Sequence, residues 1–448
     1  MTRVAEPKAP PGRDTIFALS SAPGRAGVAV IRVSGPRADD ALTALTKGPL
    51  PDARRAELRT LFDNLNNERL DIALIVRMVA PQSLTMENVV EIQTHGSRAV
   101  IGAVLTVLGR IEGFRAAEAG EFTRRAVENG RLDLTQAEAI ADLVAAETDA
   151  QRRQALRQMD GTLARLYEDW RGGLIRAAAW IEASIDFADE EVPPGALAES
   201  RQALAKIAEE IQVHLNDGRR GEILREGLHV AVIGPPNAGK SSLINALARR
   251  DVAIVSDTPG TTRDVLEVRL DLGGYPVILA DTAGLREPGD AIEREAVRRA
   301  LARARAADLR LLLLDGAAIE PIKGLDPQLQ ATAELTVWNK ADLATGFRPG
   351  RWISAKTGAG LDELIRELAR QAEARLTGES PALTRLRYRQ ALDKAVQSLK
   401  SVIEAPSASP ELAAEGVRVA LREIGRITGR VDLDDLLDVV FRDFCIGK

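Results

Sequence analysis

Residues 234–241 have the composition and spacing of a loop that wraps a phosphate chain. They read GPPNAGKS, fit the pattern G-x-x-x-x-G-K-[ST], and lie between the apolar run HVAVI and the helical segment SLINAL. The glycines let backbone N–H groups turn toward phosphate oxygens, Lys240 brings positive charge to the β- and γ-phosphates, and the Ser241 hydroxyl can bind Mg²⁺. We predict nucleotide contacts from Asn237, Ala238, Gly239, Lys240, Ser241 and Ser242.

The segment 281–284 carries a second phosphate-side motif. It reads DTAG and ends the predicted strand YPVILAD. The Asp281 carboxylate can reach the coordination shell of the magnesium ion, and the Gly284 amide can reach the γ-phosphate. The predicted phosphate site therefore also includes Asp281, Thr282, Ala283 and Gly284.

Two further segments have the residue types that select a guanine base. Residues 339–342 read NKAD, and the Asp342 carboxylate can accept hydrogens from both N1 and the 2-amino group of guanine. Adenine would leave this charge unpaired, which is costly. Residues 354–356 read SAK and offer a backbone N–H to the guanine O6. The predicted base-side residues are Asn339, Lys340, Asp342, Ser354, Ala355 and Lys356.

The group that directs the attacking water is less evident. Many GTPases have Gln directly after the glycine of D-x-x-G, but this chain has Leu285. The candidates for positioning water or neutralising charge are Glu293, Arg263 and Arg286. A solvated surface role for each is the alternative. Asn237 and the polar segment 256–262 can instead surround a monovalent cation beside the phosphates.

Strand and helix patterns alternate around these motifs from residue 229 to about 369. The predicted strands are HVAVIG, VEVRLDL, YPVILAD, LRLLLLD and LTVWNK, with helical patterns between most of them. This alternation favours a doubly wound, mostly parallel sheet with helices on both faces, an α/β P-loop domain.

Helical periodicity flanks the α/β segment on both sides. Apolar residues from Leu156 to Ile181 recur every three or four positions and predict one long helix. A second stripe from Leu204 to Leu215 predicts an antiparallel partner helix. Helical patterns return at 383–403, 411–427 and 436–444, so the α/β domain should be inserted into a discontinuous helical domain.

The beginning of the chain predicts a separate α+β domain. Apolar runs at 15–19, 27–33, 72–78 and 89–93 predict strands, and residues 99–110 predict a helix. The expected multidomain organisation is 1–130 for this domain, 131–225 for the first helical part, 226–375 for the P-loop domain and 376–448 for the second helical part.

Composition limits the class of protein further. The chain has 448 residues, of which 45% are hydrophobic and 28% charged, and this suits several folded domains. A formal net charge of −5 excludes a uniformly basic nucleic-acid-coating protein. With one cysteine, no long apolar run and no apolar N-terminal segment, we expect a cytoplasmic protein without a disulfide, a membrane span or a secretory signal.

Beyond single motifs, nearly the whole chain resembles the tRNA-modifying GTPases of the MnmE (also called TrmE) family. The resemblance rests on DTIFALSSAPGRAGVAVIRVSG at 14–35, GEFTRRAVENGRLDLTQAEAIADL at 120–143, the phosphate loop, AIVSDTPGTTRD at 253–264, DTAGLR, NKAD and the terminal FCIGK. It implies an N-terminal domain that dimerises and binds tetrahydrofolate, a discontinuous helical domain and an inserted Ras-like G domain.

The resemblance also implies a reaction. With the FAD-dependent partner MnmG, in a heterotetramer, the family installs an aminomethyl or carboxymethylaminomethyl group at C5 of the wobble uridine of tRNA, and 5,10-methylenetetrahydrofolate supplies the carbon. G domains of a homodimer would meet across K⁺ and so accelerate GTP hydrolysis. By position, K⁺ would bind Asn237, Ser256, Thr258 and Thr261, Mg²⁺ would bind Ser241 and Thr262, and Glu293 would act through the attacking water.

The folate contacts implied by position are Arg32, Glu91, Arg131 and Lys448. A carboxylate suits the N–H donors of the pterin, and cations suit the glutamate tail. Arg131 stands where the family usually has Lys, and Ser-Leu-Thr-Met-Glu at 83–87 replaces a common Ser-Tyr/Phe-Thr-Gly-Glu. Family analogy makes Cys445 a reactive thiol beside the folate, and an inert, partly buried cysteine is the alternative.

Two other functions stay open at the level of sequence. One is a ribosome-assembly GTPase of the wider G-T-T-R-D group, and the other is a nucleotide-binding scaffold without meaningful turnover. Residues 218–221 match a GXXG RNA-clamping loop but lack the flanking KH pattern, which favours a linker turn. The three histidines are scattered and indicate no metal cluster.

Overall fold

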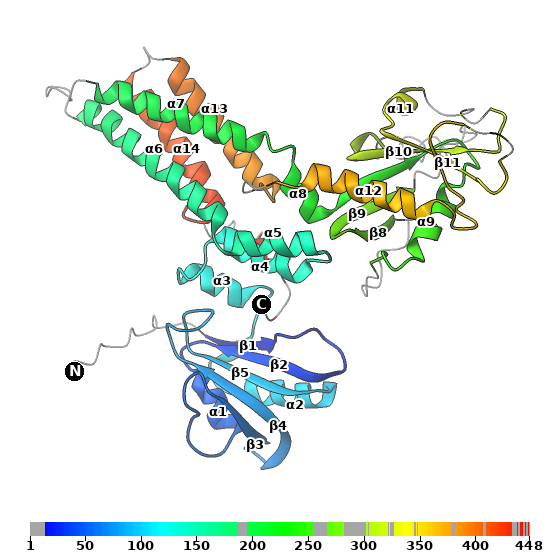
Figure 1. Cartoon of the computed structure of the whole chain (residues 1–448). Coiled ribbons are helices and arrows are strands. Elements are labelled where there is room, and N and C mark those ends of the chain that lie inside the picture. Colours follow the sequence, from blue (N-terminus) through cyan, green and yellow to red (C-terminus); the bar gives the residue numbers. More distant parts are fainter. Residues whose placement is uncertain are drawn as a thin grey trace, which may run out of the picture. The chain divides into compact units, whose positions relative to one another are not determined.

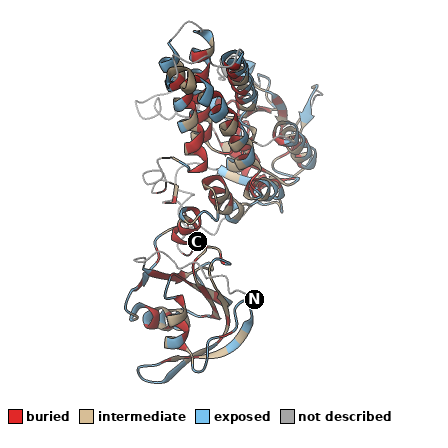
Figure 2. Cartoon of the chain, turned by 90° about the vertical axis from the view of Figure 1, so that its left-hand side faces the viewer, coloured by how far each residue is buried: buried red, intermediate tan, exposed pale blue. Residues whose placement is uncertain are grey.

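In the computed structural model the chain forms two compact units (Figure 1). The first unit consists of Met1–Ala141 together with Gly425–Lys448, and the second consists of Asp142–Ile424. The residues it describes are 14–186, 195–254, 267–281, 302, 304–320, 322, 327–344, 346, 348–378, 382–405, 409–431, 437, 440, 441, 444 and 447. Buried residues follow the inner faces of the helices and the middle strands of the sheets (Figure 2). The predicted multidomain architecture, with α+β, helical and α/β parts, is confirmed.

The first unit is built on a six-stranded sheet of order β3-β4-β5-β2-β1-β6. Its neighbouring strands are antiparallel except β1 and β6, which are parallel. Two helices, α1 and α2, pack their apolar residues on the sheet and close one hydrophobic core. The strands are β1 Thr15–Leu19, β2 Ala26–Ser34, β3 Ala56–Asp63, β4 Glu68–Met78, β5 Val89–Gly96 and β6 Phe114–Ala116, and the helices are α1 Ala38–Leu45 and α2 Arg98–Gly109.

The end of the chain belongs to this first unit. Phe441 and Phe444 pack with Val127 and Leu134 of helices α3 Glu121–Glu128 and α4 Leu134–Ala145 in a second apolar cluster. Gly447 lies so close to β1 that a Cβ atom there would come within 2.1 Å of the Leu19 carbonyl oxygen. The carboxyl end of the chain is therefore built into the N-terminal unit.

Helices form one part of the second unit. They are α5 Asp149–Met159, α6 Thr162–Asp186, α7 Ala196–Leu215, α8 Arg220–Glu226, α13 Leu386–Glu404 and α14 Pro410–Thr428. The last of them, α14, continues a few residues beyond the end of this unit at Ile424. Helices α6 and α7 run antiparallel side by side, as predicted, and α7 also packs against α13 (Figure 1). The prediction of one helix through 156–181 was wrong, because the chain turns at Gly161, whose φ of +76° is left-handed and ends the helix.

The remainder of the second unit is a doubly wound sheet of order β12-β11-β10-β7-β9-β8. All neighbouring strands are parallel except β8, which is antiparallel to β9, so the predicted mostly parallel sheet is confirmed. Apolar clusters cover both of its faces. The elements are β7 Leu228–Ile233, α9 Lys240–Ala248, β8 Glu267–Leu272, β9 Tyr275–Asp281, β10 Leu309–Asp315, α11 Pro327–Ala331, β11 Leu335–Asn339, β12 Arg351–Trp352 and α12 Leu361–Leu376.

Strand β7 lies at the centre of this sheet, between β9 on one side and β10 on the other. The strand order thus reverses beside β7. In open α/β sheets such a switch point leaves a crevice at the carboxyl ends of the strands, where ligands bind. No helix in the described part of the chain is long and apolar enough to cross a membrane.

Candidate functional site

The phosphate loop leaves the carboxyl end of β7 and turns directly into α9. A Cβ atom at Gly234 would come within 2.2 Å of the Leu313 carbonyl oxygen, and one at Gly239 within 2.3 Å of Asn339 Nδ2. Gly239 also has a φ of +93°, which only glycine adopts without strain. The two glycines therefore allow the close backbone turn that places the start of α9 at the crevice.

The side chain of Lys240 forms hydrogen bonds with the backbone at the start of the phosphate loop. Its Nζ donates hydrogen bonds to the carbonyl oxygens of Gly234, at 2.9 Å, and Pro235, at 3.0 Å. Burial lowers the pKa of this ammonium group, and the nearby charge of Asp281 opposes that shift. A positive charge withdrawn from water in this way gains strongly from an anionic partner.

Ser241 and Asp281 meet beside the loop. The Ser241 hydroxyl donates to Asp281 Oδ2 at 2.5 Å, and Asp281 is 7% exposed. Among the residues that the structure describes, none forms a hydrogen bond with the buried Asp281 Oδ1. A hydroxyl and a carboxylate with an unpaired oxygen are the hard donors that Mg²⁺ prefers, so these two residues fit a magnesium ion.

Asn339 joins the phosphate side of the site to the base side. It lies at the end of β11 and is 2% exposed. Its Nδ2 donates to the Ala238 carbonyl oxygen at 2.8 Å, and its Oδ1 accepts from the Ala355 N–H at 3.0 Å. The sequence predicted Asn339 as a base-side residue; the structure shows that its amide bridges the two loops.

The base-side acid is positioned by Ser354. Asp342 Oδ1 accepts a hydrogen bond from the fully buried Ser354 hydroxyl at 2.6 Å. This hydrogen bond lowers the pKa of Asp342, burial opposes the shift, and the charges of Lys356 and Lys340 contribute to it. The carboxylate therefore stays ionised and keeps its remaining acceptor positions toward solvent.

Sequence reasoning missed Asp315 as a member of this site. The Asp315 carboxylate at the end of β10 accepts from Lys340 Nζ at 2.5 Å. Asp315 and Asn339 are register partners in parallel strands, so an acid at the end of LRLLLLD was the available signal. The ion pair fixes Lys340, whose φ of +61° is left-handed, directly after Asn339.

The part of the site that the structure describes contains most of the residues predicted to contact the phosphates and the guanine base. The predicted catalytic residues lie outside the described part of the chain. Asn237 and Ser242 are exposed beside the loop, and Ala238 is buried under it. The predicted residues outside the described part of the chain are Ser256, Thr258, Thr261, Thr262, Thr282, Ala283, Gly284, Glu293, Cys445 and Lys448, with the alternatives Arg263 and Arg286.

In the first unit, the predicted folate residues Arg32 and Glu91 contact each other. They are register partners on β2 and β5, and Arg32 Nε donates to Glu91 Oε1 at 3.0 Å. Both side chains are about one-fifth exposed, and the Arg32 guanidinium also lies 5.6 Å from the centre of the Phe122 ring. Arg131 is exposed. A half-buried pair of this kind presents both a cation and a carboxylate at the sheet surface.

A buried polar cluster, centred on Arg125 and Glu87, lies in the same unit. Arg125 donates to Glu87 Oε2 at 3.2 Å and to Glu121 Oε1 at 2.9 Å, and the Ser34 hydroxyl donates to Glu87 Oε2 at 2.8 Å. Burial raises the pKa of Glu121, but hydrogen bonds from Arg115 and the Glu118 amide and the charge of Arg125 give a net lowering. Glu87 therefore anchors segment 83–87 rather than serving an open pocket.

The backbone at Met86 has a conformation that favours glycine. Met86 has a φ of +58°, a conformation that costs a residue with a side chain about 1–2 kcal/mol. We expect Met86→Gly to be more stable than Met86→Ala by about 1 kcal/mol, because both remove the long side chain but only glycine relieves the backbone. Thermal unfolding of the two variants measures the difference, and equal midpoints would contradict a strained backbone at this position.

The phosphate loop at the switch point, the Ser241–Asp281 pair and the Asp342 loop define a P-loop protein of the GTPase class. The family model for the MnmE helical domain matches residues 134–445, and that for the GTP-binding protein TrmE N-terminus matches residues 15–131. The chain belongs to the MnmE family of tRNA modification GTPases.

Named relatives cover almost the whole chain. The tRNA modification GTPase MnmE of Parvibaculum lavamentivorans is 54% identical over 439 residues, which are 97% of this chain and 100% of that protein. The same protein of Rhodospirillum rubrum is 54% identical over 455 residues, 97% and 99% of the two chains. The mitochondrial 5-taurinomethyluridine-[tRNA] synthase subunit GTPB3 of Danio rerio is 45% identical over 471 residues, 98% and 94% of the two chains.

Proposed function

We propose that this chain hydrolyses GTP within a complex that installs aminomethyl or carboxymethylaminomethyl groups at C5 of the wobble uridine of tRNA. The observation that carries the proposal is the Asn339 bridge between a phosphate loop and a guanine-reading loop, in a chain of the MnmE family. The relatives named as tRNA modification GTPases and as a tRNA uridine synthase subunit support the choice of substrate. They also favour this function over ribosome assembly.

Different residues of the site would bind the guanine base, the phosphates and the magnesium ion. Asp342, which Ser354 positions, would accept the two N–H donors of the guanine edge, and a backbone N–H of the SAK segment at 354–356 would donate to O6. Lys240 places its charge on the β- and γ-phosphates. Ser241 and Asp281, with Thr262, would hold Mg²⁺, which when bound neutralises charge on the phosphate oxygens.

The resemblance to the family supplies the remaining parts of the proposal. K⁺ at Asn237, Ser256, Thr258 and Thr261 stimulates hydrolysis, and two G domains of a homodimer meet across it. The partner in uridine modification is the FAD-dependent MnmG. Tetrahydrofolate binds near Arg32, Glu91, Arg131 and Lys448, and Cys445 is the reactive thiol beside it. The Arg32–Glu91 pair supports this location, because its described contacts use only one carboxylate oxygen, Oε1.

Nucleoside mass spectrometry tests the function itself. Bulk tRNA from cells that lack the gene is compared with tRNA from cells that carry it again on a plasmid. We expect the C5 substituent of wobble uridine to disappear in the first sample and to return in the second. An unchanged nucleoside profile, together with cosedimentation of the protein with ribosomal subunits, would replace this function with ribosome assembly.

The role of Glu293 is tested by GTP hydrolysis in K⁺ and in Na⁺. We expect Glu293→Ala to lower the rate in K⁺ by about 10²–10⁴-fold with near-normal nucleotide affinity, because a residue that activates water serves the transition state. The matched control is Glu295→Ala, which removes a carboxylate two positions away. Equal rates for Glu293→Ala and the wild type would remove Glu293 from the site.

A further inference from the structure

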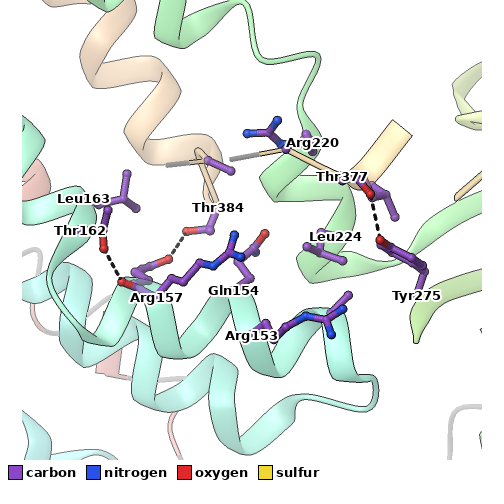
Figure 3. Close-up of a pocket in the computed structure, with 15 residues that line it drawn as sticks. Arg153, Gln154, Arg157, Thr162, Leu163, Arg220, Leu224, Tyr275, Thr377 and Thr384 are labelled. Atoms are coloured by element: carbon purple, nitrogen blue, oxygen red, sulfur yellow. Dashed lines mark hydrogen bonds between the residues drawn. The ribbon is translucent and has the colours of Figure 1, made fainter. Parts of the chain in front are cut away.

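A second pocket, which the nucleotide does not use, lies where α5 and α8 meet the α/β sheet. Its volume is about 220 Å³, and its walls come from α5, the start of α6, α8, the start of β9 and the segments on either side of residues 379–381 (Figure 3). Helical and α/β elements of the second unit therefore enclose it together. It lies at the opposite end of β9 from Asp281.

Three arginines are among the residues that line the pocket. Arg153 and Arg157 extend from one face of α5, four residues apart, and Arg220 lies on α8 across from them (Figure 3). No carboxylate is among the described residues that line it. In a chain whose net charge is −5, the exposed Arg153 and Arg157 side chains on one face of α5 offer N–H donors to an anion at the rim of this small cavity.

The walls of the pocket are held in place by their own contacts. The buried Thr384 hydroxyl donates to Gln158 Oε1 at 3.0 Å, and the Tyr275 and Thr377 hydroxyls are 2.9 Å apart. Arg220 packs so closely on the backbone of Gly378 that a Cβ atom there would lie 1.5 Å from its Nη1. The cavity is thus framed by fixed groups rather than by a chance gap between surface side chains.

The two arginines of α5 differ in how they are compensated. Arg153 pairs with Asp149 one turn earlier on the same helix. Within the described part of the chain, no carboxylate pairs with Arg157, which is exposed. An exposed guanidinium with no carboxylate partner among the described residues can bind phosphate oxygens through two parallel hydrogen bonds.

We propose that this pocket binds a backbone phosphate of the substrate RNA, and the proposal rests on the function proposed above. A cavity of about 220 Å³ is smaller than the usual site for a whole cofactor but accepts a phosphate with part of its sugar. Exposed arginines at the rim suit a polyanion that approaches from solvent and extends past the cavity. The RNA would then contact helical and α/β elements at once.

Fluorescence anisotropy with labelled tRNA and the full-length protein tests this site at several salt concentrations. We expect Arg153→Ala/Arg157→Ala to weaken tRNA binding about tenfold or more at low salt. The slope of log affinity against log salt should become shallower by about 0.7–0.9 for each phosphate that the variant no longer neutralises. Arg157→Lys should be intermediate, because it keeps the charge but not the paired donors.

Arg152→Ala is the matched control. Arg152 lies on α5, pairs with the same Asp149 and is 52% exposed against 50% for Arg153, but it does not line the pocket. We expect this variant to bind tRNA as the wild type does. If the double variant and Arg152→Ala bind tRNA equally, the pocket is not an RNA site.

A titration with inorganic phosphate and pyrophosphate distinguishes a pocket that binds RNA from a pocket that binds a small anion. If either anion raises the thermal midpoint of the wild type but not of Arg157→Ala, while tRNA affinity is the same for both, the pocket binds a small anion and the RNA proposal is overturned. If the wild type bound no tRNA on its own, the pocket would not be an RNA site; if it bound none even together with MnmG, the proposed function would be contradicted as well. Nucleotide hydrolysis without tRNA should be unchanged in every variant, since none of these residues touches the nucleotide site.

Discussion

Replacing Asp342 by Asn should make the protein prefer xanthosine triphosphate to GTP. The carboxylate accepts from two guanine donors, whereas an asparagine side chain presents one acceptor and one donor, which matches the xanthine edge. The hydroxyl of Ser354 can still donate to the asparagine oxygen, so the side chain keeps its position. Because a buried mismatch of hydrogen-bonding groups costs about 1–3 kcal/mol for each group left unpaired, we expect GTP affinity to fall about 100-fold.

Calorimetric titration of both nucleotides measures this change in selectivity. Asp362→Asn is a suitable control, because Asp362 is an exposed acid of the same domain that pairs with Arg250. It should bind GTP as the wild type does. If Asp342→Asn reduced affinity for both nucleotides equally, its carboxylate would support the fold of the loop and not read the base.

Replacing Lys240 by Ala should lower GTP hydrolysis about 10²–10³-fold. The ammonium is partly withdrawn from water and held by the Gly234 and Pro235 carbonyl oxygens, so it is poised to exchange them for phosphate oxygens. Lys240→Arg should also be impaired, because a planar guanidinium does not fit a place built for a compact charge. The rate of phosphate release at saturating and at low GTP separates impaired catalysis from impaired binding.

A surface lysine provides the comparison for this variant. Lys206→Ala removes a positive charge of α7 that is 77% exposed and only loosely paired with Glu210, so hydrolysis should stay normal. Circular dichroism should show that Lys240→Ala is folded. A folded Lys240→Ala protein with full activity would mean that the loop does not bind the β- and γ-phosphates.

The sequence predicted those parts of the fold in which the spacing of apolar residues matches their burial in the tertiary structure. The strand pattern of the α/β segment and the first strands of the N-terminal unit are confirmed, because buried strands leave continuous or alternating apolar runs. The predictions did not include β3, a strand at the edge of its sheet where Leu58 is 71% exposed and the apolar signal is weak. The break at Gly161 was missed because Met159 and Leu163 continue the helical spacing across it.

The candidate site was predictable in its motifs but not in its internal contacts. Residue type and spacing located Lys240, Ser241 and Asp281, because phosphate and Mg²⁺ chemistry demand those groups. No sequence rule states that the Asn339 amide spans two loops or that Arg32 lies opposite Glu91. Such pairs depend on strand order and register, which are set by the whole sheet and not by the residues nearby.

The insertion of the α/β segment affects how the helical bundle can assemble. Helices α7 and α13 pack together although the entire α/β segment separates them in sequence. Closing so long a loop in an unfolded chain costs conformational entropy. In the folded protein the ends of the segment meet, since Gly221 lies against the Leu383 carbonyl group. We therefore expect α7 and α13 to pack most readily after the α/β segment has folded, because the folded segment holds its two ends close together.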